Sequence, residues 1–345
     1  MKPMTISDPP RHMQIFDELA RLIAIRPVSH DVVEMGFRSP KIAAAARPAQ
    51  FVNVLVPPEG FGYRIFESEE EWLAAQRLPR PFLVRRPFSV YRTYRTDPTD
   101  PTDPTDPTDP ADGTGGEWPP DTIDILVRMV GPGTRQLARL SPGADVRILG
   151  PLGSSFELPP PGASAALVAG GCGWASLELL ARELCRRAQR TYAFIGAKSV
   201  EEMPIPTALG KRPHPFLEDL PEACVTSREL EELGVIVALS AEQGGRVYGG
   251  LVTDLIEKFL KSDHGRNAHI YACGPWVMLR RVAELARDFD APCQVALEER
   301  MGCGLGVCNS CVVEVILPDG AIGHKRLCQE GPVLDAYEVN WAARR

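Results

Sequence analysis

Four cysteines near the C-terminus constrain this chain more than any other feature. They are Cys303, Cys308, Cys311 and Cys328, and their spacing is C-x4-C-x2-C-x16-C. The first three match the ligand pattern of plant-type [2Fe-2S] clusters, in which four thiolates converge on two irons. Glycines flank and separate the first two ligands, and glycine permits the tight backbone that such a loop requires. The spacing therefore predicts an iron–sulfur site with these four cysteines as ligands.

Two other interpretations of the cysteines stay open at this point. Structural zinc is usually held by paired C-x2-C knuckles. This chain has one such pair, and a glycine-rich C-x4 arm that zinc does not require precedes it. The other alternative is a set of ordinary buried thiols that bind no metal. Iron–sulfur ligation is the favoured interpretation, and it implies one-electron transfer.

Length and composition indicate a soluble protein of two or three domains. The chain has 345 residues, of which 44% are hydrophobic and 24% charged, as in ordinary globular proteins. No basic segment followed by an apolar one opens the sequence, and no apolar run is long enough to span a membrane. The five remaining cysteines lie in apolar or helical contexts, where reduced thiols are expected. These features predict a cytoplasmic location with no membrane partner.

A repeated Pro-Thr-Asp tract dominates the net charge of −7. Asp97 to Asp112 contains six aspartates and no basic residue, and without it 39 acidic and 38 basic residues remain. Proline at every third position favours extended, solvated backbone, so residues 96–116 are expected to form a disordered insertion. The rest of the chain is nearly neutral, and no nucleic-acid partner is expected.

Short strands separated by turns are predicted over the first half of the chain. The predicted strands are Arg21–Arg26, Val32–Phe37, Gln50–Val56, Arg85–Tyr91, Ile123–Val130 and Asp145–Leu149. They favour an antiparallel barrel or sandwich. A helix is expected before them over Met13–Ile25, and a short helical patch over Glu69–Gln76. The two strands beside the acidic tract are expected to pair, with the tract as an enlarged hairpin loop.

Strands and helices alternate from Ala163 onward. The predicted strands are Ser164–Ala169, Thr191–Gly196, Val235–Ser240 and Ala268–Ala272, and the predicted helices are Trp174–Gln189, Val252–Ser262 and one after Pro275. This alternation predicts a doubly wound parallel sheet. The expected fold class is therefore mixed β and α/β. Its three units are an antiparallel barrel (20–160), an α/β domain (161–292) and a small cluster domain (293–345).

Two motifs in the barrel half are typical of diphosphate binding. Arg86-Pro87-Phe88-Ser89 offers a guanidinium group, a hydroxyl group and free backbone N–H groups, which suit a diphosphate. Gly131-Pro132-Gly133-Thr134 precedes a helical pattern, and amides at a helix N-terminus bind anions. Each motif alone is also consistent with a solvated edge strand or a plain turn.

Two further motifs in the α/β half indicate a nucleotide site. Gly170-Gly171-x-Gly173 follows a strand and opens a helix, the arrangement in which dinucleotide domains bind phosphates. Cys273-Gly274 ends a later strand, at the edge where open α/β sheets bind ligands. A small residue and a glycine let a flat ring approach the backbone there. A nucleophilic Cys273 is disfavoured, because no motif places a histidine beside it.

In this order, the elements resemble the ferredoxin–NADP reductase-like flavoproteins. The run Glu298–Val312 and the closing Cys328–Pro332 are similar to the electron transfer subunits of two-subunit, NAD-dependent dihydroorotate dehydrogenases. The resemblance covers roughly residues 20–335. It implies a barrel that binds FAD, an α/β domain that binds NAD(H), and a [2Fe-2S] domain that faces an FMN-containing catalytic subunit. It also implies a heterotetramer of two plus two subunits that acts in de novo pyrimidine (UMP) biosynthesis.

The resemblance assigns roles by matched motif. It implies FAD-binding roles for Arg86, Pro87, Phe88, Ser89, Leu126, Val127, Arg128, Gly133 and Thr134. It implies that Gly170, Gly171 and Gly173 line the NAD(H) diphosphate, and that Cys273 and Gly274 flank the nicotinamide. The cluster ligands are the four cysteines of the opening motif. No separate catalytic side chain is expected, because the cofactors carry the chemistry.

The chain departs from the resembled family in three places. Ser176 stands where the family typically has proline, and the acidic tract and residues 59–81 are additional. Ala197-Lys198-Ser199 does not decide between NADH and NADPH. Two alternative functions therefore stay open. One is a relay subunit of a hydrogenase, sulfide dehydrogenase or transhydrogenase complex, and the other is a non-catalytic regulator that binds zinc or senses redox state.

Overall fold

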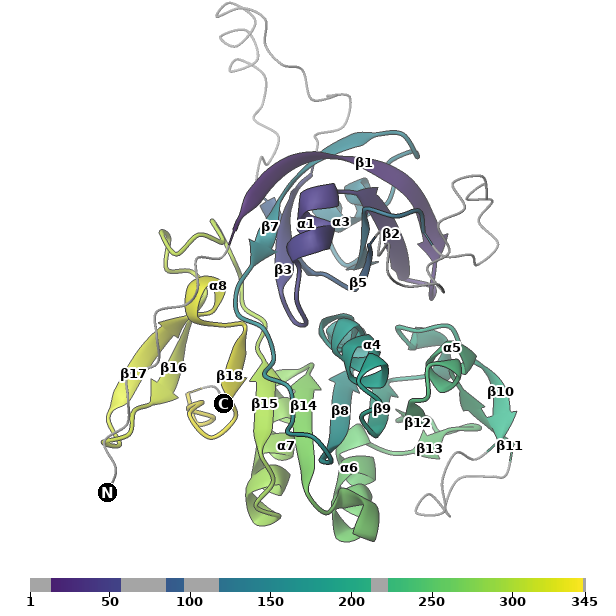
Figure 1. The fold of residues 1–345 in the computed structure, drawn as a ribbon, viewed down its shortest axis with the longest axis vertical. Coiled ribbons are helices and arrows are strands. Elements are labelled where there is room, and N and C mark those ends of the chain that lie inside the picture. Colours follow the sequence, from purple (N-terminus) through teal and green to yellow (C-terminus); the bar gives the residue numbers. More distant parts are fainter. Residues whose placement is uncertain (1–13, 57–84, 96–117, 212–222, 344–345) are drawn as a thin grey trace, which may run out of the picture.

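The computed structural model describes residues 14–56, 85–95, 118–211 and 223–343 (Figure 1). The predicted insertion at residues 96–116 and the predicted helical patch at residues 69–76 lie outside the described residues. Three units follow one another along the chain: a curved β-sheet, a parallel sheet covered by helices, and a small C-terminal unit (Figure 1). No helix in the described part of the chain is long and apolar enough to cross a membrane.

The first unit is an antiparallel sheet with the strand order β4-β3-β7-β1-β2-β6-β5. Its strands are β1 (Phe16–Pro27), β2 (Val32–Arg38), β3 (Phe51–Leu55), β4 (Arg85–Ser89), β5 (Arg92–Tyr94), β6 (Thr122–Arg128) and β7 (Asp145–Leu152). Strands β4 and β5 are neighbours in the sequence but lie at opposite ends of this order. The sheet must therefore curl until its two ends approach each other, which gives the predicted antiparallel barrel. Helices α1 (Pro40–Ala45) and α3 (Pro132–Leu137) pack against it (Figure 1).

The helix predicted over Met13–Ile25 is wrong, because most of this segment forms β1. Ala20 and Leu22 are fully buried, and Arg21 between them is exposed. This two-residue period suits a strand with one face on the core. Strand β1 pairs with β2 on one side and β7 on the other. Backbone pairing on both sides therefore overrides the helical propensity of the segment.

The pairing predicted across the acidic insertion is also wrong in part. Strand β4 pairs with β3, and the short strand β5 pairs with β6 instead. The chain crosses between the two ends of the sheet at Val90 and Tyr91. The Val90 N–H donates to the Gln50 carbonyl at 2.9 Å, and the Tyr91 N–H donates to the Asp124 carbonyl at 2.8 Å. The crossover therefore occurs before the insertion, and β5 and β6 flank the insertion.

The second unit contains a sheet with the order β13-β12-β9-β8-β14-β15-β18. Its strands are β8 (Ser164–Gly170), β9 (Thr191–Ala197), β12 (Ile236–Ala241), β13 (Tyr248–Gly249), β14 (Ala268–Cys273), β15 (Cys293–Ala296) and β18 (Val333–Asp335). All pairs are parallel except β15 with β18. A ribbon of β10 (Ala208–Lys211) and β11 (Ala223–Thr226) lies beside this sheet (Figure 1).

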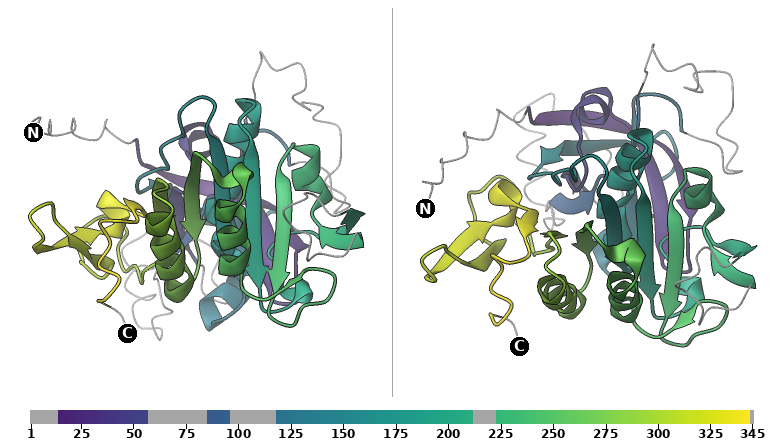
Figure 2. Two further views of the ribbon diagram at one scale, coloured as in Figure 1. Left: turned by 90° about the horizontal axis from the view of Figure 1, so that it is seen from below. Right: turned by 60° about the horizontal axis from the view of Figure 1, so that its bottom comes forward.

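Helices cover both faces of the parallel sheet, as a doubly wound fold requires. They are α4 (Glu178–Arg186), α5 (Arg228–Glu232), α6 (Val252–Lys261) and α7 (Trp276–Asp288). Val168 of β8 packs with α6 and α7, whereas its neighbour Leu167 packs with α4. Figure 2 shows α6 and α7 side by side on one face. The helix predicted over Trp174–Gln189 begins instead as a 3₁₀-helix, η1 (Gly171–Ser176), and α4 ends at Arg186.

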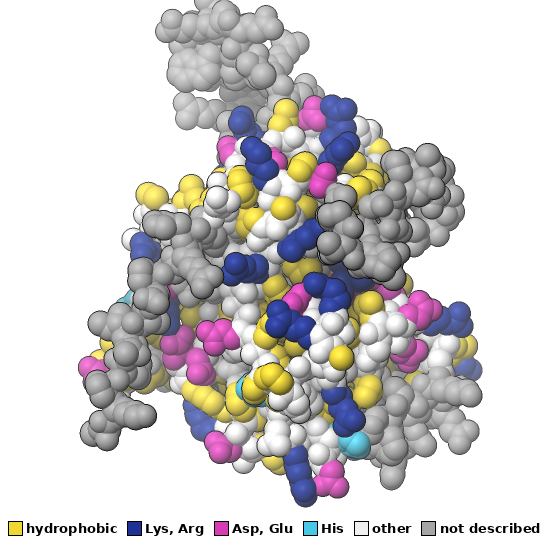
Figure 3. Space-filling view, in the orientation of Figure 1, with side chains coloured by type: hydrophobic (Ala, Val, Ile, Leu, Met, Phe, Trp, Pro, Cys, Tyr) yellow, Lys and Arg dark blue, Asp and Glu magenta, His cyan; other side chains and the backbone are white. Residues whose placement is uncertain are grey.

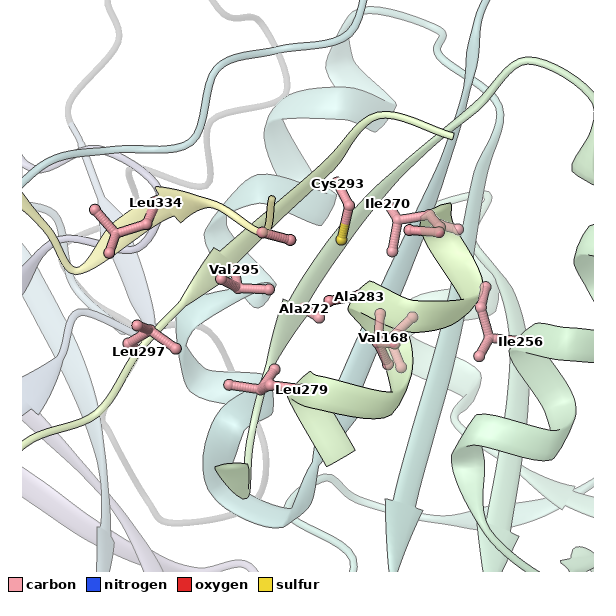
Figure 4. Close-up of a cluster of buried hydrophobic side chains, with 14 of the residues drawn as sticks. Val168, Ile256, Ile270, Ala272, Leu279, Ala283, Cys293, Val295, Leu297 and Leu334 are labelled. Atoms are coloured by element: carbon pink, nitrogen blue, oxygen red, sulfur yellow. The ribbon is translucent and has the colours of Figure 1, made fainter. Parts of the chain in front are cut away.

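The C-terminal unit shares a hydrophobic core with the parallel sheet. It contains β16 (Val312–Ile316), β17 (Ile322–Arg326) and α8 (Leu327–Glu330), and it returns to the sheet as β18. Figure 4 shows Leu334 of β18 in one cluster with Val295 of β15 and Leu279 of α7. Leu327 and Cys311 belong to the same buried cluster. The C-terminal unit is therefore packed firmly onto the α/β unit.

Candidate functional site

The two diphosphate motifs of the barrel lie together. Arg86 is on β4, and Gly133 is in the first turn of α3. A β-carbon added to Gly133 would lie 3.2 Å from a guanidinium nitrogen of Arg86, so glycine leaves the guanidinium room to rest on this turn. The Thr134 hydroxyl lies 3.1 Å from both the N–H and the carbonyl of Gly131. It closes the turn that begins the helix.

The predicted flavin residues of β6 differ in how accessible they are. The side chains of Leu126 and Val127 are buried in the core, so only their backbone is available to a ligand. Arg128 is exposed and forms ion pairs with Asp31 at 2.7 Å and Glu202 at 3.4 Å. The hydrogen bond to Asp31 raises the pKa of Arg128. Arg128 therefore links the barrel to the α/β unit, where Glu202 ends the 3₁₀-helix η2 (Val200–Glu202).

The two nucleotide motifs of the α/β unit also lie together. Ala169 and Cys273 are register partners near the carboxyl ends of β8 and β14. A β-carbon on Gly170 would collide with the Pro275 ring, and one on Gly173 would collide with the Cys273 carbonyl. Glycine at both positions therefore lets the turn pack directly on the Cys-Gly-Pro segment. This edge is where an open α/β sheet binds its ligand.

A chain of polar side chains joins strand β4 to the turn that follows β8. The Ser89 and Ser176 hydroxyl oxygens are 2.8 Å apart, and the Cys273 thiol lies 3.5 Å from the Ser176 oxygen. The thiol also lies 3.9 Å from a Glu298 carboxyl oxygen. Burial raises the pKa of Cys273, which is fully buried. Cys273 is therefore held as a thiol, which further disfavours a nucleophilic role.

Sequence reasoning did not predict that Ser176 and Glu298 join this chain. In the sequence, Ser176 stands out only as a departure from the family pattern. Glu298 begins the run that resembles the family's cluster segment, and the resemblance implies no role for it. An acidic residue directly after the buried apolar run Val295-Ala-Leu297 is the sequence signal for a carboxyl group at the end of this strand.

Backbone amides in the cysteine loop point at sulfur atoms. The Cys303 sulfur accepts hydrogen bonds from the N–H groups of Leu305, Val307 and Cys308 at 3.3–3.4 Å. The Cys328 sulfur accepts one from the Gly306 N–H at 3.1 Å. Gly306 has a φ of +78°, a conformation that favours glycine. Amides directed at sulfur are what an anionic thiolate cluster requires, so this donor set fits a [2Fe-2S] cluster.

The four thiols differ in exposure. Cys308 is exposed, and its hydrogen bonds with Ser310 lower its pKa to about 6. Cys311 and Cys328 are buried, and burial raises the pKa of Cys328 to about 12. Within the described ranges, no three His, Cys, Asp or Glu side chains are grouped as ligands of one metal ion. The cysteine loop therefore exposes Cys308 to solvent and turns Cys311 and Cys328 toward the core.

A buried ionic network connects the barrel to the α/β unit on the side away from the cysteine loop. Arg92 of β5 donates to Glu178 at 3.1 Å and to Glu229 at 2.9 Å. Glu178 is fully buried and also accepts from Arg182 at 2.8 Å and from the Trp174 indole at 2.8 Å. These long-range contacts fix the orientation of the two units.

Comparison with known proteins places these features in a family. Residues 298–340 match the model described as the iron-sulfur cluster binding domain of dihydroorotate dehydrogenase B. The dihydroorotate dehydrogenase B (NAD(+)) electron transfer subunit of Desulforamulus reducens is 29% identical over 328 residues, which cover 95% of this chain and 99% of that protein. The corresponding subunit of Bacillus caldolyticus is 36% identical over 218 residues, which cover 62% and 73%.

Solved structures support the fold. The structure of an NADH-dependent reduced ferredoxin-NADP oxidoreductase superposes with a TM-score of 0.64 at 23% identity, covering 94% of this chain and 91% of that one. An Amycolatopsis cytochrome P450 reductase gives a TM-score of 0.54 at 20% identity, covering 83% and 69%. The predicted fold class is thereby confirmed. The chain belongs to the family of dihydroorotate dehydrogenase B (NAD(+)) electron transfer subunits.

Proposed function

We propose that this chain carries electrons between NAD(H) and an FMN-containing dihydroorotate dehydrogenase subunit, through FAD and a [2Fe-2S] cluster. The observation that carries this proposal is the cysteine loop, whose amides point at the sulfurs of Cys303 and Cys328. It lies within the segment that matches the family's cluster domain. In the physiological direction the partner oxidises dihydroorotate and this chain reduces NAD⁺, as a step in pyrimidine biosynthesis.

The residues that contact the cofactors are part of the proposal. Arg86, Gly133 and Thr134 hold the flavin diphosphate, and the rest of β4 with the backbone of Leu126–Arg128 supports the flavin. The turn Gly170–Gly173 holds the nucleotide diphosphate, and Cys273-Gly274 lies beside the nicotinamide. The cysteines hold the cluster. When bound, the flavin exchanges a hydride with the nucleotide and single electrons with the cluster, and the protein sets their positions.

The larger organisation is proposed in the same terms. Residues 20–160 form the FAD-binding barrel, residues 161–292 the NAD-binding domain and residues 293–345 the cluster domain. Two copies of this chain join two catalytic subunits in a cytoplasmic heterotetramer. On the face in Figure 3, the acidic and basic side chains of the described residues are interspersed.

Co-expression with the catalytic subunit tests the proposal. The complex is expected to reduce NAD⁺ when dihydroorotate is added, and each subunit alone is expected not to do so. A Cys311→Ser variant of the complex is expected to lose the coupled activity, while the partner still reduces an artificial acceptor. Activity with hydrogen or sulfide in place of dihydroorotate would favour another relay complex.

Visible spectroscopy separates the relay from a non-catalytic regulator. The purified chain is expected to show flavin bands and an iron–sulfur shoulder, and NADH is expected to bleach both. A colourless, zinc-containing protein would contradict the proposed function. Titration with NADH and then with NADPH decides which nucleotide is preferred.

A further inference from the structure

A buried asparagine of the barrel contacts the cysteine loop directly. Asn53 lies in β3, and it is only 1% exposed. Its side-chain Nδ2 donates a hydrogen bond to the backbone carbonyl of Cys303 at 3.2 Å. This bond joins the barrel to a predicted ligand of the cluster across 250 residues of sequence.

The loop is shaped to receive this asparagine. A β-carbon added to Gly304 would overlap the Asn53 Nδ2 and lie 3.4 Å from the Leu152 side chain of β7. Gly304 also has a φ of +71°, which strains any residue with a side chain. The bend of the loop at Gly304 therefore sits in a socket formed by Asn53 and Leu152.

The same asparagine neighbours the proposed flavin strand. Asn53 is the register partner of Pro87 in β4, and the Arg85 guanidinium donates to the Asn53 carbonyl at 3.2 Å. Paired strands lie about 4.8 Å apart. The backbone of the Arg86–Ser89 motif therefore lies only one strand away from Asn53, the residue that contacts the cysteine loop.

Packing within the barrel does not explain why the buried residue at position 53 is polar. The Asn53 Oδ1 is buried and has no hydrogen-bond partner among the described residues. A buried oxygen without a partner destabilises the fold. The amide nitrogen of the same side chain donates its hydrogen bond to the loop. The loop contact is thus the interaction that compensates for burying this amide.

We propose that Asn53 is a positioning residue that fixes the cluster loop against the flavin strand and so sets the path of electrons between flavin and cluster. The inference rests on the proposed function, because it assumes that both cofactors bind. It assigns Asn53 no chemical step. One electron crosses between the two cofactors, and no bond forms or breaks at Asn53.

An Asn53→Leu variant tests the role without opening a large cavity. Flavin reduction by NADH is expected at the wild-type rate, whereas the following reduction of the cluster slows in stopped-flow measurements. Release of the cluster to an iron chelator is expected to be faster, roughly two- to tenfold, as for the loss of one hydrogen bond. The barrel is expected to be at least as stable as in wild type in urea unfolding, because leucine removes the unpaired oxygen. A purely structural asparagine would give the opposite result for stability.

Asn340→Leu is the matched control. Asn340 also uses its amide in the C-terminal unit, donating to Glu314 at 2.8 Å, but it does not contact the cysteine loop through that bond. Its chelator-release rate is expected to equal that of wild type. Equal release rates in Asn53→Leu and wild type would overturn the inference.

A size exchange gives a second, independent test. Gly304→Ala places a methyl group on Asn53 and is expected to accelerate cluster release. Adding Asn53→Ala to that variant is expected to accelerate release by less than Asn53→Ala does alone, because the new methyl group has already displaced the Asn53 amide. Fully additive effects would show that Gly304 and Asn53 do not act through one contact. If NADH fails to reduce the flavin of the wild-type chain, the proposed function fails, but the chelator measurements still decide whether Asn53 holds the loop.

Discussion

Replacing Arg92 with methionine is expected to lower the free energy of unfolding by about 3 kcal/mol. Methionine keeps much of the apolar stem of the side chain and removes the guanidinium group. The side chain of Arg92 is 10% exposed, and that of Glu178 is fully buried. The change therefore leaves a buried carboxylate without one of its two cationic partners.

The magnitude follows from what remains around Glu178. Removing one partner of a buried ion pair costs about 3–5 kcal/mol. Glu178 keeps its bonds to Arg182 and to the Trp174 indole, both at 2.8 Å. The Glu229 side chain is 37% exposed, so water can replace Arg92 there. Both facts place the loss at the lower end of the range, which is still a large part of a typical stability of about 5–15 kcal/mol.

Urea unfolding followed by circular dichroism measures the loss. Arg280→Met is the matched control, because Arg280 forms an exposed pair with Glu284 that contributes only about 0.3–0.5 kcal/mol. Adding Glu178→Gln to Arg92→Met removes the buried carboxylate that has lost one of its two cationic partners, so the double variant is expected to lose less than the sum of the single variants. An Arg92→Met loss no larger than that of Arg280→Met would refute the reasoning.

Three further outcomes are expected. Burial, together with neighbouring Glu34, raises the pKa of Asp124. The folded protein therefore binds this proton more tightly than the unfolded chain does, and the stability that the proton contributes is lost as pH rises. Asp124→Asn is expected to reduce the fall in melting temperature from acidic to neutral pH, and an unchanged profile would contradict the assignment. Ser176→Ala removes the hydrogen bonds to Ser89 and Cys273. It is expected to slow flavin reduction by NADH roughly two- to tenfold in stopped-flow measurements. An unaltered rate would show that these polar side chains do not position the site. The thiol of Cys273, whose pKa burial raises, is expected to resist alkylation in the folded protein until denaturant is added, as read by mass spectrometry of the modified peptides.

Much of the fold was predictable because local patterns agree with tertiary packing. The apolar runs that became β8, β9 and β14 are buried on both faces of a parallel sheet, the setting in which such runs are expected. The segment of β1 was mistaken for a helix because its strand pattern depends on two distant neighbours, β2 and β7. The three-residue strand β18 is too short to show any periodicity.

The site was predictable where its signal is local. The cysteine spacing and the glycine turns are contiguous motifs, and the structure brings each pair of motifs together as expected; the roles of individual residues stay predictions. The contacts of Ser89 with Ser176 and of Asn53 with Cys303 join residues 87 and 250 positions apart. No spacing rule connects such residues, because their proximity arises only when the barrel and the sheet are packed together.

The segment from Arg85 to Arg92 contacts the α/β unit directly, and its strand partner Asn53 contacts the cysteine loop. Asn53 beside Pro87 bonds to the cysteine loop, Ser89 contacts the nucleotide turn through Ser176, and Arg92 enters the buried ionic network. The crossover at Val90 and Tyr91 prevents this segment from shifting along the sheet, because it is bonded to both ends of the barrel. If β4 binds the flavin as proposed, its separate contacts with the α/β unit and, through Asn53, with the cysteine loop let each cofactor distance be set independently. Substitutions at Asn53 and at Ser176 are therefore expected to have additive effects, the first on cluster reduction and the second on flavin reduction. Strong coupling between them would show that a shift of β4 at one contact is transmitted to the other.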